Sequence, residues 1–213
     1  MANRSIEFKT RGKGKVKTKA VYLFLAEGKN KTETLYFNNF QSQENDYVIR
    51  FAKAGNRTDA TSLYDCMLEK WREWELSAEK GDRGFIVLDI DNSPQKVETV
   101  AKLVANNNNS AIEFIVSNPT FEVWFLLHFK YTTKYFADGE AVIRELKRYI
   151  PDYEKSKDYY DICSCKIQDA LSSANKLERQ YKEVEWPSLM CNPRTDVGKV
   201  VSFLVEALNN SRK

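Results

Sequence analysis

The sequence has few of the residues that build zinc sites. Its 213 residues include one histidine, His128, and four cysteines, Cys66, Cys163, Cys165 and Cys191. No two cysteines have the CxxC spacing of a structural zinc site, so the pattern does not favour bound zinc. Such sparse cysteine usage is typical of a protein kept in a reducing compartment.

Long hydrophobic runs are also missing. No apolar stretch approaches the ~20 residues that a membrane-spanning helix needs. The first residues lack the apolar core of a secretory signal peptide. We therefore expect a cytoplasmic protein without a membrane partner.

A large excess of one charge is missing as well. The 33 lysines and arginines and the 30 acids leave a net charge of only +3, so the total charge says little about partners. The positive charges are concentrated, however, because six of them lie between Lys9 and Lys19 with no acid among them. We predict a basic arm over residues 1–18, which either binds a phosphate backbone or only keeps the chain soluble.

The chain does contain apolar runs that alternate with helical patterns. Hydrophobic residues make up 42% and aromatic residues 13% of the chain, which is enough for a substantial core. Runs typical of buried strands lie at about 20–27, 47–54, 83–91 and 111–116, with helical spacing between them. Such alternation predicts right-handed crossovers, and hence an α/β fold with a mostly parallel, four-stranded, Rossmann-like sheet flanked by helices.

After residue 130 the pattern becomes helical. Apolar residues recur at helical spacing over about 139–149, 166–182 and 195–209. We therefore predict an α/β domain over residues 19–130 and a helical C-terminal subdomain over residues 131–213.

Acidic residues follow two of the predicted strands. Glu27 ends the first strand, and Asp89 and Asp91 end the third with an i, i+2 spacing that places both on one side of a strand. Because parallel sheets bind ligands at the carboxyl ends of their strands, these carboxylates are expected at one shared edge. Such hard oxygen ligands suit Mg²⁺ or Mn²⁺, and Gly28 allows a tight turn or a close ligand. The alternative is that the two aspartates are solvated acids that open a loop.

The fourth strand leads to further candidates at the same edge. Asn118 suits the N-cap of a helix that continues to residue 129, with Pro119 in its first position, and the free N–H groups there would attract a phosphate. Glu122 is either a further acid of the site or a first-turn acid favoured by the helix dipole. His128 lies about 240° further round that helix, so it does not share a face with Glu122. It is either a core residue or a general acid–base group.

Polar residues elsewhere complete the set of candidates. Lys29 and Lys31 either reach a phosphate or are solvated loop lysines. Glu33 is either a supporting acid or one half of a capping box. Arg194 is a candidate phosphate contact, and Thr195 is a sound N-cap for the last helix.

Taken together, these segments resemble the Toprim domain, which occurs in topoisomerases, bacterial primases and nucleases of the overcoming-lysogenization-defect type. More specifically, they resemble the RloB family of Toprim proteins from restriction and phage-defence loci. The segments that carry the resemblance are Glu27-Gly28 with Thr32-Glu33 and Tyr36-Phe37, the strand end with Asp89 and Asp91, Ser117-Asn118-Pro119 with Phe121-Glu122, Trp124 and His128-Phe129, and Asn192-Pro193 with Thr195 and Val197. The chain departs from the family pattern at Asn92, where relatives often carry another acid, and by one extra residue between Gly28 and Thr32.

The resemblance implies a Toprim-like fold in which Glu27, Asp89 and Asp91 hold Mg²⁺ or Mn²⁺. It also implies a nuclease that hydrolyses phosphodiester bonds of DNA or RNA, transfer RNA included, as the effector of an anti-phage abortive-infection system. The implied partners are nucleic acid and an ABC-type ATPase encoded nearby, since the sequence has no nucleotide-binding loop of its own. Two alternatives stay open: a non-catalytic nucleic-acid-binding module, and a phosphoryl or nucleotidyl transferase that uses the same metal site. Assembly into a homo-oligomer stays open too.

Overall fold

The computed structural model describes residues 19–27, 32–53, 55, 57 and 59–211. The predictions for the arm over residues 1–18 and for Gly28, Lys29 and Lys31 lie outside the described residues. Within them, no helix is long and apolar enough to cross a membrane.

The centre of the fold is one sheet with the strand order β2-β1-β3-β4-β5. Its strands are β1 (Ala20–Ala26), β2 (Tyr47–Phe51), β3 (Arg83–Asp89), β4 (Ile112–Asn118) and β5 (Arg194–Thr195). The first four are parallel, and β5 pairs antiparallel with β4. The α/β class and the mostly parallel sheet are confirmed, but the sheet has five strands rather than the predicted four. The fifth strand has only two residues, too few to leave a periodic signal in the sequence.

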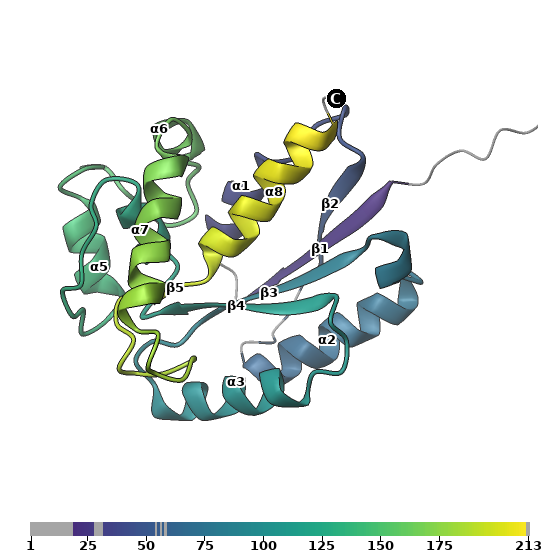
Figure 1. Cartoon of the computed structure of the whole chain (residues 1–213), viewed down its shortest axis with the longest axis horizontal. Helices are drawn as coiled ribbons and strands as arrows, with labels where there is room; N and C mark the ends of the chain where they lie inside the picture. Colours follow the sequence, from purple (N-terminus) through teal and green to yellow (C-terminus); the bar gives the residue numbers. More distant parts are fainter. Residues whose placement is uncertain (1–18, 28–31, 54, 56, 58, 212–213) are drawn as a thin grey trace, which may run out of the picture.

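Helices cover both faces of this sheet (Figure 1). In chain order they are α1 (Thr32–Asn38), α2 (Ala60–Glu73), the 3₁₀ helix η1 (Ala78–Lys80), α3 (Pro94–Asn106), α4 (Glu122–Leu127), α5 (Gly139–Leu146), α6 (Tyr160–Ser164), α7 (Ile167–Gln180) and α8 (Val197–Ser211).

Each face of the sheet has its own hydrophobic core. On one face, Phe24 of β1 and Phe85 of β3 pack with buried residues of α1, α4 and α8. On the other face, Leu25 and Leu88 pack with buried residues of α2 and α3. Figure 1 shows α8 above the sheet and α2 and α3 below it. Because both faces are covered, the central strands are continuous apolar runs rather than alternating ones.

After the helices α5, α6 and α7, the last part of the chain packs against the sheet again. β5 adds to the edge of β4, and α8 then packs across the sheet. The ring of Phe203 in α8 lies 5.0 Å from that of Tyr22 and 5.9 Å from that of Phe85, measured between centroids. Residues 131–213 therefore contribute a strand and part of the core to the sheet, besides the predicted helices.

Candidate functional site

Three of the predicted acids lie at the carboxyl edge of the sheet. Glu27 directly follows β1, Asp89 is the last residue of β3, and Asp91 lies two residues beyond it. Because β1 and β3 are neighbours in the sheet, their ends adjoin. The fold thus gathers these three side chains from two separate segments of the chain.

A lysine joins two of these acids. Lys96 Nζ, in the first turn of α3, lies 2.9 and 3.1 Å from the two carboxylate oxygens of Glu27 and 2.7 Å from Asp91 Oδ2. It also donates to the backbone carbonyl of Asp89 at 3.1 Å. Burial by itself lowers the pKa of Lys96, but the hydrogen bonds with Asp91 and Glu27 outweigh it and raise the pKa above its usual value. Glu27 and Asp91 therefore converge on one cationic atom.

Asp89 and Asp91 have different partners, although the i, i+2 spacing predicts that they point together. β3 ends at Asp89, and the chain then turns through Asp91 and Asn92, which both have a φ of 53°. Because strand alternation stops at this turn, Asp91 binds Lys96 while Asp89 Oδ2 accepts a hydrogen bond from Thr120 Oγ1 at 2.9 Å. The second oxygen, Asp89 Oδ1, is buried and has no hydrogen-bond partner among the described residues.

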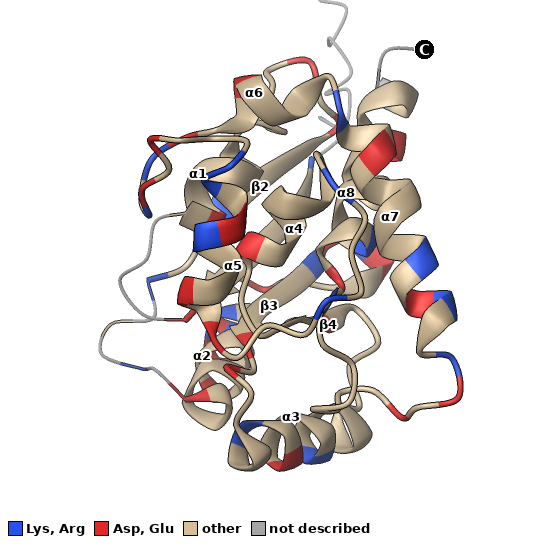
Figure 2. Cartoon of the chain, turned by 90° about the vertical axis from the view of Figure 1, so that its left-hand side faces the viewer, with Lys and Arg blue, Asp and Glu red and all other residues tan. Residues whose placement is uncertain are grey.

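Two further acids are buried close to Asp89. Glu122 Oε2 lies 2.6 Å from Thr120 Oγ1, and Glu122 Oε1 accepts a hydrogen bond from the Tyr153 hydroxyl at 3.0 Å. Glu33 is 7% exposed, and its Oε2 has no partner in the described part of the chain. Figure 2 shows acidic segments of α1 and α4 beside one another. Burial, and then the charges of Glu33 and Glu122, raise the pKa of Asp89 well above its usual value, and burial raises the pKa of Glu33 to about 7.

The positive charges near these acids do not balance them. Lys96 contacts Glu27 and Asp91, and Lys155 Nζ lies 3.5 Å from Glu122 Oε1. Five acids, namely Glu27, Glu33, Asp89, Asp91 and Glu122, thus face two lysines, an excess of three negative charges if all are ionised. The cluster therefore holds protons at neutral pH or attracts a further cation.

The carboxylates of this cluster are chemically suited to bind a divalent metal ion. Carboxylate oxygens are the ligands that Mg²⁺ and Mn²⁺ prefer, and Asp89 Oδ1 is buried without a hydrogen bond from the described residues. Among those residues, no three histidine, cysteine, aspartate or glutamate side chains are arranged to hold a metal ion. Lys96 already lies between Glu27 and Asp91. An ion would therefore bind in exchange for the Lys96 ammonium.

Asn118 does not take the predicted place at a helix N-terminus. α4 begins at Glu122, and Phe121 at its N-cap makes no side-chain capping bond. Asn118 is the last residue of β4, where it pairs with Arg194 of β5, and this pairing extends the strand past its predicted end. Its buried Nδ2 donates to the carbonyl of Cys191 at 3.1 Å, so the side chain holds a loop of the protein.

Arg194 and Thr195 form β5 and are both buried. Arg194 is 6% exposed, its guanidinium lies 4.5 Å from the ring centroid of Trp186, and it is 3.4 Å from Glu178. Thr195 does not take the predicted N-cap position, because it ends β5 and α8 begins two residues later at Val197; its Oγ1 accepts a hydrogen bond from Val197 N at 3.2 Å. Arg194 is thus packed inside the protein rather than presented to a phosphate.

His128 lies in an aromatic environment. It is 2% exposed, its Nδ1 donates to the Trp124 carbonyl at 2.9 Å, and its ring lies edge-on to Trp124 and Tyr36. Burial lowers the pKa of His128 to about 4, so the imidazole is neutral at pH 7. The charged side chains that act on it are Asp169 and Lys166, not the five acids.

Asn92 ties the turn after β3 to two distant segments. Its Nδ2 donates to the carbonyls of Phe136 at 2.9 Å and Ala137 at 2.8 Å, and its Oδ1 accepts from Asn192 Nδ2 at 2.8 Å. An ionised aspartate could not donate to those carbonyls. The amide at this departure from the family pattern therefore has a structural role of its own.

Four residues near the acids were not identified from the sequence: Lys96, Thr120, Tyr153 and Lys155. Only Lys96 carries a local signal, because a lysine in the first turn of a helix opposes the helix dipole and so indicates another partner for its charge. Thr120 contacts Glu122 from two residues away, and Tyr153 and Lys155 contact it only because of the tertiary fold. Hydrophobic periodicity reveals neither kind of contact.

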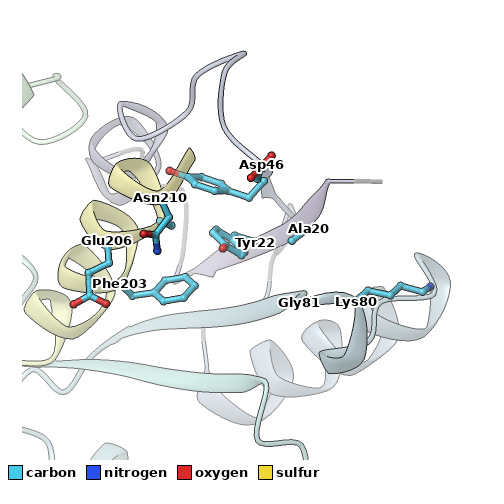
Figure 3. A pocket seen from close by; sticks show the side chains of 10 residues that line it. Ala20, Tyr22, Asp46, Lys80, Gly81, Phe203, Glu206 and Asn210 are labelled. Carbon is cyan, nitrogen blue, oxygen red and sulfur yellow. The ribbon is translucent and has the colours of Figure 1, made fainter. Parts of the chain in front are cut away.

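Cavities lie at both ends of the sheet. One of about 230 Å³ adjoins the acids and includes Glu27, Asp89 and Lys96 in its lining. Another of about 380 Å³ lies between the start of β1 and α8, where Tyr22 and Phe203 line it (Figure 3). Because parallel sheets bind ligands at the carboxyl ends of their strands, we place the candidate site at the smaller cavity.

Comparison of the chain with known proteins identifies its family. Searches of curated proteins and of solved structures found no match to the chain. The family model described as RloB-like protein matches residues 22–204 of the 213. The matched stretch begins in β1 and ends in α8, so it contains all five acids and both lysines of the cluster. The chain therefore belongs to the RloB-like protein family.

Proposed function

We propose that this chain is a metal-dependent nuclease that hydrolyses phosphodiester bonds of DNA or RNA, transfer RNA included. The main support is the convergence of Glu27 and Asp91 on one cationic atom, with Asp89 buried beside them. This cluster lies at the edge of a parallel sheet where ligands usually bind. The assignment to the Toprim fold, suggested by the same glutamate and Asp-x-Asp arrangement, is part of this proposal.

Glu27, Asp89 and Asp91 would hold the divalent ion. Bound Mg²⁺ or Mn²⁺ supplies charge neutralisation for a phosphate and lowers the pKa of a bound water. Lys96, released from the two carboxylates, adds a positive charge for the phosphate oxygens. Thr120 Oγ1 lies within hydrogen-bond distance of both Asp89 and Glu122. Its hydroxyl donates to one of the two carboxyl groups and accepts from the other when that group is protonated, so the three groups share two protons.

We further propose that the nuclease is the effector of an anti-phage abortive-infection system. In this proposal an ABC-type ATPase encoded nearby restrains and triggers it. The support is membership of the RloB-like family together with a sequence that has no nucleotide-binding loop of its own. Energy-dependent regulation would therefore come from the partner.

Cleavage assays with the purified full chain test the nuclease proposal. The substrates are single- and double-stranded DNA, unstructured RNA and transfer RNA, with Mg²⁺ or Mn²⁺, alone and with the ATPase. We expect Glu27→Gln and Asp91→Asn each to lower cleavage by roughly 100-fold or more, as the loss of a transition-state contact does. The control Asp65→Asn changes an exposed acid on α2 and should leave cleavage unchanged.

Two outcomes would contradict the nuclease proposal. If no substrate is cleaved with or without the ATPase, a non-catalytic nucleic-acid-binding module is favoured. If both site variants cleave as the unmodified chain does, the cleavage does not use Glu27 and Asp91, and the proposed metal site is wrong. Product analysis after incubation with nucleoside triphosphates separates hydrolysis from nucleotidyl transfer.

A further inference from the structure

The cavity of about 230 Å³ beside the acids has a largely apolar wall. Leu88 comes from β3, Ala60 from α2 and Val100 from α3, and all three belong to the hydrophobic core on that face of the sheet. The cavity therefore lies between this hydrophobic core and the carboxyl edge of the sheet. A site that held only a phosphate would not need such a wall.

Two uncharged polar side chains lie on one side of this cavity. Gln95 and Thr99 are four residues apart on α3, so they share one face of the helix. Gln95 is exposed and Thr99 is half-buried. The amide and the hydroxyl can each donate and accept hydrogen bonds, which suits the edge of a heterocyclic ring.

The charges of the lining disfavour an anion inside the cavity. Glu27, Asp59 and Asp89 contribute three acids, and the single lysine, Lys96, is already paired with Glu27. Asp59 accepts a hydrogen bond from Ser62 N at 2.9 Å, so a carboxylate covers the N-terminus of α2. The cavity thus suits a flat uncharged group, and an amine on that group can use the lone pairs that Asp59 keeps beside its bonds from Ser62.

We propose that this cavity binds a nucleobase, that of the nucleotide whose phosphate lies at the five acids. Leu88 and Val100 provide the apolar surface on which the ring packs. Gln95 and Thr99 form hydrogen bonds with the polar edge of the ring. Asp59, the lining carboxylate that the proposed function does not assign to the metal ion, favours adenine, cytosine and guanine, which carry an exocyclic amine, over uracil and thymine. This inference rests on the proposed function and adds to it a pocket that determines base preference.

Binding measurements with the full chain test the pocket without requiring cleavage. Titration calorimetry in Mg²⁺ compares AMP, CMP and UMP with ribose 5-phosphate and inorganic phosphate. We expect AMP and CMP to bind at least about tenfold more tightly than ribose 5-phosphate, and UMP to bind less tightly than CMP. A tetranucleotide protected by phosphorothioate linkages should show the same base dependence.

A matched pair of variants assigns any base dependence to this cavity. Thr99→Trp fills it from a half-buried position and should abolish the preference for AMP and CMP over ribose 5-phosphate. Glu98→Trp places the same side chain at the next, exposed position of α3 and should keep the preference. Melting temperatures close to that of the unmodified chain show that both variants are folded.

The outcomes for the pocket and for the nuclease are distinct. Equal affinity for the nucleotides and ribose 5-phosphate, a preference that survives in folded Thr99→Trp, or a preference seen with free monophosphates but not with the tetranucleotide would overturn the pocket. Base-dependent binding that Thr99→Trp removes supports the pocket even when no substrate is cleaved. Cleavage without base-dependent binding would keep the nuclease and overturn the pocket.

Discussion

Lys96 separates the acids of the carboxyl edge into two kinds. Glu27 and Asp91 share its positive charge, whereas Asp89 and Glu33 are buried next to other acids. Burial and like charges raise the pKa of Asp89 and Glu33. A carboxyl group whose pKa is raised in this way can hold a proton closer to neutral pH, which suits a general acid or base.

Glu33 predicts how the stability of the protein depends on pH. Its pKa rises from 4.5 to about 7 on folding, so between these values the folded state keeps a proton that the unfolded state releases. Stability due to this proton is present below pH 4.5 and is lost as the pH rises through about 7. In Glu33→Gln this loss is absent. We expect the free energy of unfolding of the variant, relative to the unmodified chain, to increase by about 2–3 kcal/mol between pH 5 and pH 8.

The difference between the two proteins is the quantity to measure, by urea unfolding at each pH. His128 acts in the opposite direction, because its folded pKa of about 4 lies below its ordinary value of 6.5 and so makes stability rise over that window. This contribution is common to both proteins and cancels in the difference. Parallel stability curves for the two proteins would show that Glu33 does not hold a proton near pH 7.

At the scale of elements, α4 connects the acids to the aromatic core. Its six residues are all buried, and Glu122 at its start belongs to the acid cluster. His128 follows its last residue and packs against Trp124 and Tyr36. The two candidate residues at either end of α4 thus have different surroundings, as their angular separation on the helix predicts.

His128 is expected to support stability rather than catalysis. His128→Phe keeps a ring in the aromatic core, so the proposed nuclease activity, per folded molecule, should stay within about threefold of that of the unmodified chain. His128→Ala removes the ring and should lower the free energy of unfolding by about 2–4 kcal/mol, as large-to-small core substitutions do. Urea unfolding and cleavage assays measure the two effects separately. A folded His128→Phe protein that loses activity by 100-fold would return His128 to the catalytic residues.

At the scale of the whole molecule, residues after 130 complete both the core and the site. Tyr153 and Lys155 contact Glu122, and Phe203 packs on the sheet. Asn192 joins the turn after β3 through Asn92. The α/β part and the helical part therefore share a core and a hydrogen-bond network.

Removal of residues 131–213 is therefore expected to prevent folding of the rest. The remaining chain would expose the face of the sheet that α8 covers and would leave Glu122 without its contacts to Tyr153 and Lys155. Circular dichroism during urea unfolding should show one cooperative transition for the full chain and none for residues 1–130. A cooperative transition of the shorter chain would identify it as an independent domain.

Much of the fold was predictable because its signals are local. The apolar runs of β1 and β3 and the acids that follow them are contiguous in the sequence. The strands and the α/β class therefore followed from periodicity, and the shared edge for Glu27, Asp89 and Asp91 followed from the parallel direction of the strands. β5 and the pairing of Asn118 were missed because each depends on a partner more than 70 residues away.

The sequence by itself determined which acids the sheet presents, because strand ends and side-chain types are local properties of the chain. The tertiary structure decided what each acid contacts. Lys96 reaches Glu27 across 69 residues of sequence, and Tyr153 reaches Glu122 across 31. Such contacts depend on how helices pack on the sheet, and packing sets the burial and charge that distinguish Asp89 from Asp91.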